Sequence, residues 1–485
     1  MCGIVAVTRS KESKTILELG LRGLQHRGQD SVGLAGFLDD DCSVLATHKQ
    51  LGSVAKLVSD NGIDKFNASP LVIGHTRYAT RNLADSSRQM HPHWAQSMRG
   101  RCAIVTNGDL VNTQELETYL KEREVKLYTN NDGELLAALV NYFSAIDRLA
   151  IPAAIEKAIS LIQGGAAALM VFEGSSSIWA FKDSNGIRPM YVGTCDIDGD
   201  ITSIASSETG TFGIVRRFAE GKHGAKNVKV TYRAVLPGEV VELKEGCAPE
   251  TRIAGNTADE HKCIFEAVYF SRPDSAEKTT PYHRIRESFG AALWEMDKLT
   301  ADVIVAVPKG GIPAALGYSK ASGIPYNPII LEEPVTGGFR TFITSDEFRA
   351  SLVAIKYIVL EQDLVGKSVV LIDDSLVRGT TTRFLVRQLK AFGAKEVHLR
   401  IASPPYKHSC HYGIQTADPK SLIYFGKKLD SVCEELDADS LRFLDVETLL
   451  TLGEGPSEGY CSECFTGITP LTRNGKPVTM MRIES

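Results

Sequence analysis

The sequence predicts two domains of different architecture, α+β in the first half and α/β in the second. In the first half, short apolar runs that end in Gly, Asn or Ser alternate with helical segments, as expected for stacked sheets flanked by helices. Beyond about residue 240, near-continuous apolar runs at 302–307 and 368–372 each lead through a glycine-containing loop into a helical segment. This is the βαβ pattern of a parallel sheet. Residues 245–251 are turn-rich and polar, and we expect them to link the two domains.

The individual elements follow from local patterns. The segment at 151–163 has Pro152 just inside its start and stops before Gly164, which is typical of a helix. In the second half, a helix is expected after 302–307 as far as Lys320, and another after 368–372 with Leu385, Leu389 and Phe392 on one face. The remaining expected strands are 70–74, 102–105, 167–172, 201–205 and 396–401, and the remaining expected helices are 13–24, 113–123 and 132–146.

Composition places the chain among globular proteins. Its 485 residues suffice for two to four domains, and 43% hydrophobic with 23% charged residues argues against disorder or collagen-like repeats. Lys plus Arg number 54 against 59 for Asp plus Glu, which gives no electrostatic reason to bind nucleic acid or an anionic membrane. No apolar run approaches 18 residues, and the start of the chain lacks the basic region of a signal peptide. We expect a cytoplasmic protein with reduced cysteines, or one from an organelle stroma after loss of a transit peptide.

Cys2 is a candidate nucleophile. Its small side chain permits removal of Met1, which would leave a cysteine with a free α-amine. A thiolate is a strong nucleophile, and an α-amine with a pKa of about 7.7–8.0 can serve as its general base near neutral pH. Taken alone, a cysteine at position 2 is more often incidental than catalytic.

Five segments in order resemble the N-terminal-nucleophile (Ntn) glutamine amidotransferases. They are MCGIV (1–5), QHRGQDS (25–31), GHTRYAT (74–80), TNGDL (106–110) and TNNDGE (129–134). Singly, each segment could be a polar turn or hold a structural ion pair. Their joint order behind a cysteine at position 2 favours the catalytic interpretation.

This resemblance implies roles that suit each residue type. The Asn107 side-chain amide and the Gly108 N–H would form an oxyanion hole, because preorganised neutral donors stabilise a tetrahedral oxyanion. Arg77 would bind the glutamine α-carboxylate as a bidentate pair, and Asp132 would bind the α-amine. Arg27 would lie in a loop that closes over bound glutamine.

The segment VLIDDSLVRGTT (370–381) joins a buried strand, two acids and a small-residue loop that opens a helix. Amide groups at a helix N-terminus cradle phosphate, and Asp373 and Asp374 can hold ribose hydroxyls or a Mg²⁺. The segment resembles the phosphoribosylpyrophosphate (PRPP) loop of type I phosphoribosyltransferases. The residues implied to bind PRPP are Lys309, Gly310, Gly311, Asp373, Asp374, Ser375, Val377, Arg378, Gly379, Thr380 and Thr381.

Together, these motifs make the whole chain resemble the amidophosphoribosyltransferase family, which further segments at 267–275, 314–318, 400–405 and 464–467 also fit. The resemblance implies an αββα Ntn-hydrolase domain at 2–240 and a type I phosphoribosyltransferase domain at 255–485. The implied reaction converts PRPP, glutamine and water to 5-phosphoribosylamine, glutamate and pyrophosphate in purine biosynthesis, with Mg²⁺ at the second site. A homo-oligomer and nucleotide feedback inhibitors are also implied.

Four cysteines suggest a metal centre. The CxxC of Cys461 and Cys464 is open to zinc, redox and iron–sulfur interpretations. The positions of Cys263 and Cys410 resemble those of the ligands in family members with a [4Fe–4S] cluster, so we expect that cluster, with zinc or structural thiols as alternatives. The other five, Cys42, Cys102, Cys195, Cys247 and Cys433, are interpreted as core or incidental residues.

Two departures from the family pattern lie at the second site. Lys309-Gly310 stands where the family carries Asp-Ser, and LEEPVTGGFR (331–340) replaces the cationic flexible loop, with only 340–343 keeping its pattern. Lost cations and added carboxylates should weaken contact with a diphosphate. These changes motivate one alternative, a divergent paralogue that uses another acceptor. A second alternative is a PRPP-sensing regulatory protein, which the intact Cys2, Arg77, Asn107 and Asp132 argue against. A third, a sugar-phosphate aminating enzyme, lacks support because residues 373–381 point to PRPP.

Overall fold

The computed structural model describes residues 1–485 except 79–86, 259, 277, 333–355, 415, 417, 454–458, 474–475 and 478–485. The chain divides into two compact units. The first comprises Met1–Lys262, His411–Gln415 and Thr469–Ser485, and the second Cys263–Cys410 and Thr416–Ile468. Residues 245–251, expected to link two domains, instead contain the turn between two paired strands of the first unit, and the division falls at Lys262.

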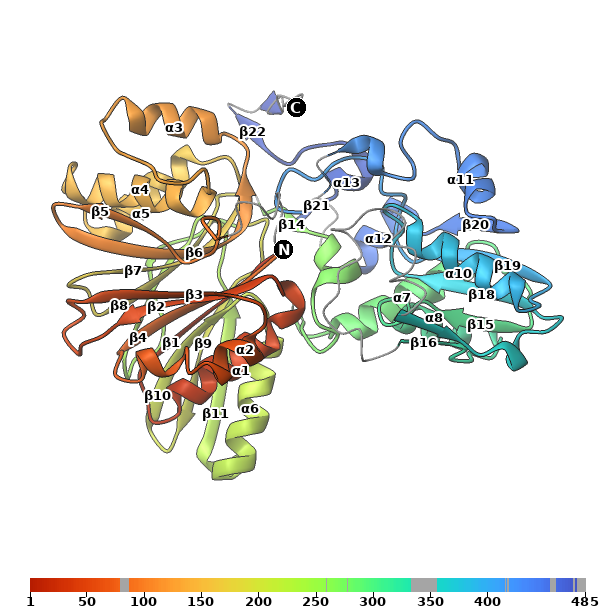
Figure 1. The fold of residues 1–485 in the computed structure, drawn as a ribbon, viewed down its shortest axis with the longest axis horizontal. Helices are drawn as coiled ribbons and strands as arrows, with labels where there is room; N and C mark the ends of the chain where they lie inside the picture. Colours follow the sequence, from red (N-terminus) through yellow and green to blue (C-terminus); the bar gives the residue numbers. More distant parts are fainter. Residues whose placement is uncertain are drawn as a thin grey trace. The chain divides into compact units, whose positions relative to one another are not determined.

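The first unit has four layers, with helices on the outer faces of two stacked antiparallel sheets (Figure 1). The strand orders are β11-β9-β10-β1-β4-β2-β3 and β13-β12-β8-β7-β6-β5. The strands are β1 (Gly3–Thr8), β2 (Ser31–Phe37), β3 (Leu45–Leu51), β4 (Leu71–Arg77), β5 (His93–Ser97), β6 (Gly100–Leu110), β7 (Gly164–Phe172), β8 (Ser177–Lys182), β9 (Tyr191–Ile197), β10 (Asp200–Ser206), β11 (Val228–Ala234), β12 (Val240–Lys244) and β13 (Glu250–Ile253).

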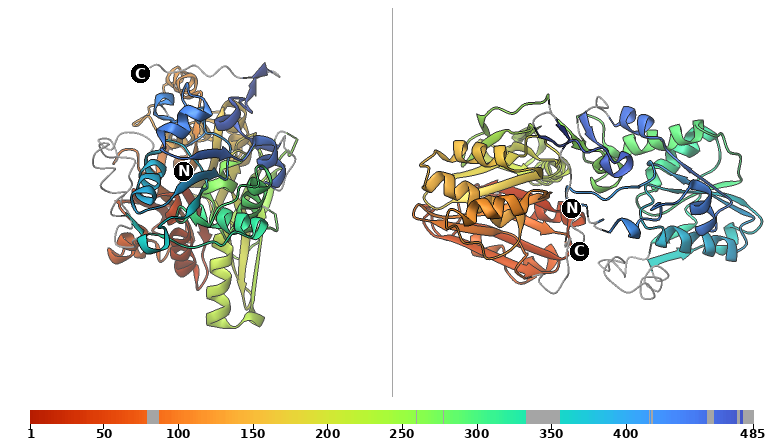
Figure 2. Two further views of the ribbon diagram at one scale, coloured as in Figure 1. Left: turned by 90° about the vertical axis from the view of Figure 1, so that its right-hand side faces the viewer. Right: turned by 90° about the horizontal axis from the view of Figure 1, so that it is seen from above.

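Alternation along the strands explains the layering. On β1, Ile4 packs in the core between the sheets together with Val105 of β6, whereas Val5 points to the opposite face and packs with Leu21 of a covering helix. A strand buried on both faces reads as a continuous apolar run, and all of β1 is buried. The helices over the seven-stranded sheet are α1 (Ser13–Gly23), α2 (Val54–Ser59) and α6 (Gly210–His223), and α6 runs alongside β11 and β9 (Figure 2).

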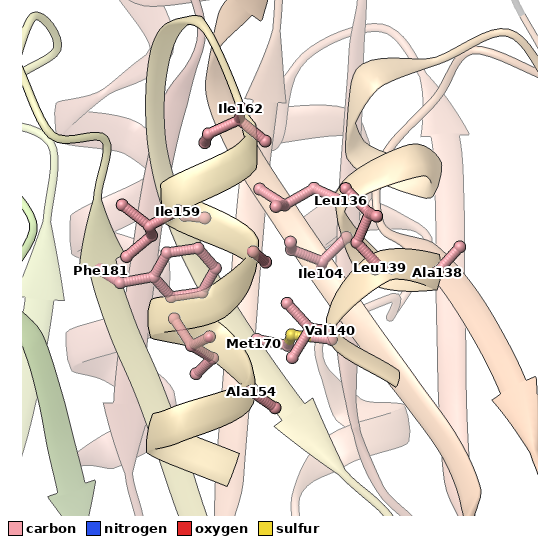
Figure 3. Packing of buried hydrophobic residues seen from close by; sticks show 14 of the residues in the cluster. Ile104, Leu136, Ala138, Leu139, Val140, Ala154, Ile159, Ile162, Met170 and Phe181 are labelled. Carbon is pink, nitrogen blue, oxygen red and sulfur yellow. The ribbon is translucent and has the colours of Figure 1, made fainter. Parts of the chain in front are cut away.

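Three helices cover the six-stranded sheet. Figure 3 shows Ile104 of β6 and Met170 of β7 packing against Leu139 and Ile159, which come from two of these helices. The helices are α3 (Thr113–Lys121), α4 (Asp132–Ala145) and α5 (Ile151–Leu161). The four helices predicted in this half of the chain are therefore confirmed, as are the strands expected at 70–74, 102–105, 167–172 and 201–205.

The second unit is built on a parallel sheet of order β15-β18-β19-β20, as predicted from the apolar runs. Two of its helices approach closely, because a methyl group added to Gly290 would lie 1.8 Å from the carbonyl oxygen of Ala314. Strand β14 (Lys262–Cys263) spans the division between the units. The other strands of the second unit are β15 (Val303–Ala306), β16 (Ile330–Glu332), β17 (Tyr357–Val359), β18 (Ser368–Asp373), β19 (Glu396–Ile401), β20 (Ser440–Phe443) and β21 (Tyr460–Cys461). Its helices are α7 (Tyr282–Glu295), α8 (Ile312–Ser322), α10 (Thr380–Ala391), α11 (Leu429–Glu435), α12 (Val446–Leu452) and α13 (Glu463–Thr466). Two short strands, β22 (Thr472–Arg473) and β23 (Lys476–Pro477), belong to the first unit. Within the described part of the chain, no helix has the length and hydropathy needed to cross a membrane.

Candidate functional site

Cys2 and Asn107 meet in the first unit. Cys2 directly precedes β1, and its main-chain N–H donates to Oδ1 of Asn107, near the end of β6, at 3.2 Å. The Nδ2 of Asn107 is buried and has no hydrogen-bond partner among the described residues. Leaving a buried donor unpaired costs about 1–3 kcal/mol. This amide is therefore available to a bound ligand, as an oxyanion-hole donor must be.

Gly108 has a conformation that no other residue can adopt here. Its φ is +144°, and an added methyl group would lie 1.8 Å from the carbonyl oxygen of Gly165 in the paired strand β7. The glycine therefore permits close packing of β6 on β7 at the position where the second oxyanion donor was predicted.

Arg77 and Asp132 line one pocket with Cys2, Asn107 and Gly108, so the structure brings five predicted residues together. Arg77 ends β4 and is buried; burial lowers the pKa of its guanidinium, while the neighbouring Cys2 opposes that shift. Asp132 begins α4 and accepts from the Leu110 N–H at 2.6 Å through Oδ2. Residues of this pocket that the sequence did not indicate as ligands are Met1, Tyr78, Gln89, His91, Thr106, Asp109, Asn130, Asn131 and Gly413.

Arg27 lies on the short helix η1 (Gln25–Arg27) and is fully buried, outside the set that lines the pocket. Its Nε donates to the carbonyl oxygen of Cys2 at 3.0 Å, and its Nη1 lies 2.5 Å from Oε1 of Glu208. Burial alone would raise the pKa of Glu208, but His26 and Arg27 outweigh it and hold that pKa well below its usual range. A role for Arg27 over glutamine stays a prediction. Its observed contact holds the main chain of Cys2.

In the second unit, Asp373 ends β18 and Asp374 follows it, and both are buried. Ser375 Oγ donates to Oδ1 of Asp374 at 2.7 Å, and Thr382 Oγ1 lies 3.4 Å from Oδ2 of Asp373. Burial raises the pKa of both carboxyls, and for Asp373 the charge of Asp374 adds to the effect. A bound cation would offset this cost of ionisation, so the pair fits Mg²⁺.

The glycine loop packs against these acids. A methyl group on Gly310 would lie 1.5 Å from Oδ2 of Asp374, and one on Gly311 would lie 2.4 Å from the carbonyl oxygen of Ile372. Gly379 has a φ of +74° and caps α10, whose first residues are Thr380 and Thr381. The structure thus places the predicted loop 309–311 against Asp374, and the predicted loop Ser375, Val377 and Arg378 between β18 and α10.

The replaced loop is described only at its start. Glu332 ends β16, and its Oε2 lies 3.9 Å from Nζ of the exposed Lys309, while Oε1 lies 3.7 Å from Nζ of Lys356. Residues 333–343 of that loop, and residues 79 and 80 of the GHTRYAT segment, lie outside the described residues.

Cys263, Cys410, Cys461 and Cys464 all belong to the second unit and are thiols. Burial raises the pKa of Cys461 and Cys464, and the charges of other cysteines of this set raise it further. Four cysteines suit an iron–sulfur cluster chemically. However, among the described residues no three or more His, Cys, Asp or Glu side chains are set to hold a metal ion.

Comparison with known proteins adds evidence from the whole chain. Residues 75–211 match the glutamine amidotransferase domain. Amidophosphoribosyltransferases from Synechocystis sp., Bacillus subtilis and Homo sapiens are 35%, 34% and 31% identical to this chain over 97% of its length, and over 91%, 94% and 97% of their own.

Solved structures agree. Glutamine PRPP amidotransferase from B. subtilis, complexed with ADP and GMP, is 32% identical with a TM-score of 0.83 over 100% of both chains. A structure described as the allosteric regulatory enzyme of purine biosynthesis is 32% identical with a TM-score of 0.84, over 99% of this chain and 98% of its own. The chain belongs to the amidophosphoribosyltransferase family. The predicted fold class is also confirmed: an Ntn glutamine amidotransferase fold is followed by a phosphoribosyltransferase fold.

Proposed function

We propose that this chain catalyses the glutamine-dependent amidophosphoribosyltransferase reaction of purine biosynthesis, converting PRPP, glutamine and water to 5-phosphoribosylamine, glutamate and pyrophosphate. The observation that carries the proposal is the pocket in which Cys2, Arg77 and Asp132 surround the unpartnered amide of Asn107. Full-length similarity to the family supports it.

In the first half-reaction, loss of Met1 turns the Cys2 nitrogen into an α-amine, which Oδ1 of Asn107 orients. The amine takes the thiol proton, and the thiolate attacks the glutamine amide carbon. Asn107 Nδ2 and the Gly108 N–H accommodate the oxyanion. The amine passes its proton to the leaving ammonia, and water then hydrolyses the thioester to glutamate and the free thiol. Arg77 and Asp132 hold the carboxylate and ammonium of the substrate.

In the second half-reaction, ammonia passed within the protein attacks C1 of PRPP, the C1–O bond breaks, and pyrophosphate leaves. The amides of Gly310 and Gly311 and the Lys309 ammonium would meet the diphosphate, and the start of α10 would hold the 5-phosphate. Asp373 and Asp374 would bind ribose hydroxyls and Mg²⁺. When bound, Mg²⁺ neutralises charge on the diphosphate. Lys309 gives this loop a cation, so PRPP binding is altered rather than lost.

The first experiment is anaerobic incubation of the purified protein with glutamine, PRPP and Mg²⁺, following glutamate and pyrophosphate together. PRPP-dependent release of both in equal amounts is the expected result. Glutamate without pyrophosphate would overturn the second half-reaction and favour another acceptor. Cys2→Ala should abolish glutamine use and keep ammonia-dependent pyrophosphate release, whereas Cys247→Ala, at an exposed cysteine of the same unit, should keep both.

A [4Fe–4S] cluster on Cys263, Cys410, Cys461 and Cys464 is part of the proposal. Protein purified without oxygen should contain about four iron and four sulfide ions per chain and absorb visible light, and Cys461→Ser should lose both signals. Zinc, or thiols without metal, would rule the cluster out. Cytoplasmic location, a homo-oligomer and inhibition by purine nucleotides such as ADP and GMP complete the proposed assignment.

A further inference from the structure

Three buried histidines stack beside the glutaminase pocket. His75 lies on β4, two residues before Arg77, and His91 and His93 flank Pro92 at the start of β5. The His75 and His91 rings are stacked with centroids 4.3 Å apart and 16° between their planes, and the His93 ring meets the His91 ring edge-on at 4.6 Å. All three side chains are buried, and His91 lines the pocket itself.

The hydrogen bonding of these rings is sparse. His75 Nε2 lies 3.1 Å from the carbonyl oxygen of Thr106. A carbonyl only accepts, so Nε2 carries the hydrogen. Nδ1 of His75, Nδ1 of His91 and Nε2 of His93 are buried without a partner in the described part of the structure. Each buried atom without a partner lowers the free energy of unfolding by about 1–3 kcal/mol, and an apolar ring of similar size would avoid this loss.

The surroundings keep the stack neutral. Burial lowers the pKa of all three imidazoles, to about 3 for His75 and His93. The cations that face them act in the same direction: Lys49 of β3 and Arg77 of β4 for all three, and the chain's N-terminus for His75. His75 therefore has one protein hydrogen bond, through a neutral Nε2–H.

The acceptor of the His75 hydrogen bond, Thr106, directly precedes Asn107 in the sequence. Thr106 and Asn107 are neighbours on β6, so a donor held against the Thr106 carbonyl fixes the peptide plane that precedes the oxyanion amide. The other side of the stack is also held. A methyl group on Gly133 in the first turn of α4 would lie 2.6 Å from Cε1 of His91, so this ring packs directly on the helix that begins with Asp132.

We propose that His75 is a positioning residue for the oxyanion hole, acting through Thr106 on Asn107, and that the face of the His91 ring holds the His75 imidazole in the required plane. The inference rests on the proposed glutaminase half-reaction. It predicts an effect on the transition state, because the oxyanion forms only there, and a smaller effect on glutamine binding.

The test measures kcat and KM for glutamine in the full chain, with ammonia-dependent pyrophosphate release as a check of folding. His75→Phe removes the bond to Thr106 but keeps the ring, and should lower kcat by about 10-fold to 100-fold with KM changed less than about 2-fold. His75→Gln supplies an N–H at similar reach and should recover most of kcat. His91→Ala should lower kcat in the same way, and His91→Phe, which keeps the stacked face, should lower it less than His91→Ala does.

Two outcomes overturn the inference. Equal kcat values for wild type, His75→Phe and His75→Gln would remove the role of the bond, and a rise in KM without a fall in kcat would place these rings in substrate binding. If His75→Phe also loses the ammonia reaction, it has misfolded. The kcat values of His75→Gln, His91→Ala and His91→Phe then decide whether the inference holds. Absence of glutamate formation by the wild-type chain would instead refute the proposed function itself. His223→Phe, on α6 away from the stack, is the matched control and should behave as wild type.

Discussion

Arg27 and Glu208 form a buried ion pair in which Nη1 lies 2.5 Å from Oε1, with side-chain exposures of 0% and 1%. The same guanidinium donates from Nε to the carbonyl oxygen of Cys2, at 3.0 Å. A buried charge that loses its partner is costly, by about 3–5 kcal/mol. The pair therefore fixes the main chain of Cys2, the proposed nucleophile, and disrupting the pair is costly.

Glu208→Ala should lower the free energy of unfolding by about 3–5 kcal/mol, because it leaves the Arg27 charge buried without its partner. Urea denaturation of the full chain measures this change, and glutaminase kcat should fall with it. Glu245→Ala is the control, since it breaks an exposed ion pair with Arg9 and should cost about 0–1 kcal/mol. Equal effects of the two substitutions would contradict the importance of the buried pair.

Gly108→Ala should remove glutaminase activity while ammonia-dependent synthesis continues. The added methyl group meets the Gly165 carbonyl at 1.8 Å, so β6 must shift away from β7 just where Asn107 and Gly108 are proposed to form the oxyanion hole. Loss of one oxyanion donor costs about 100-fold to 1,000-fold in kcat. Steady-state assays with glutamine and with ammonia separate the two reactions. Gly221→Ala, where an added methyl group meets no described atom within 4 Å, should retain both activities.

Local sequence patterns predicted most of this architecture. The helix expected at 132–146 is Asp132–Ala145, and the strand expected at 396–401 is Glu396–Ile401. Their periodicity and end signals act over a few residues, and the sequence displays these directly. The two acids at the end of β18 and the asparagine on β6 could be located for the same reason, since each belongs to a short continuous motif.

Features that join distant parts of the chain were not predicted. Glu208 lies 181 positions from Arg27 in the sequence, and no local pattern pairs them. Residues 245–251 contain the same turn-forming residues whether they close a hairpin or link domains, and only the pairing of β12 with β13 decides between the two. The His-Pro-His sequence at 91–93 was visible, but its stacking on His75 depends on strand packing.

Gly310→Ala should have the opposite effect to Gly108→Ala. Its methyl group would lie 1.5 Å from Oδ2 of Asp374, so either the glycine loop or the carboxylate must move. We expect PRPP-dependent pyrophosphate release to fall at least about 100-fold, with basal glutaminase activity retained, and Asp374→Asn to give the same pattern. Pyrophosphate release with glutamine and with ammonia measures the loss. Full PRPP turnover in both variants would rule out this loop as the PRPP site.

The histidine stack should make the first unit sensitive to acid. His93 has a pKa of about 3 in the folded chain because burial, foremost, and then Lys49 disfavour its charged form, whereas an unfolded histidine has a pKa of about 6.5. Below about pH 6.5 the unfolded chain therefore binds a proton that the folded chain does not. The contribution of neutral His93 to the free energy of unfolding is complete above about pH 6.5. It is lost as the pH falls toward 3, by about 1.4 kcal/mol per pH unit.

His93→Phe removes this proton uptake while keeping a ring in the same place. Between pH 7.5 and pH 5, the free energy of unfolding should therefore fall about 2 kcal/mol less in the variant than in the wild type. Urea denaturation at the two pH values measures the difference, and amide exchange in β4 and β6 reports on the first unit. Parallel losses in both proteins would mean that His93 is protonated in the folded state, and the neutral stack would then be wrong. A variant that loses less stability than the wild type on acidification would establish that the buried His93 imidazole stays neutral in the folded chain between pH 7.5 and pH 5.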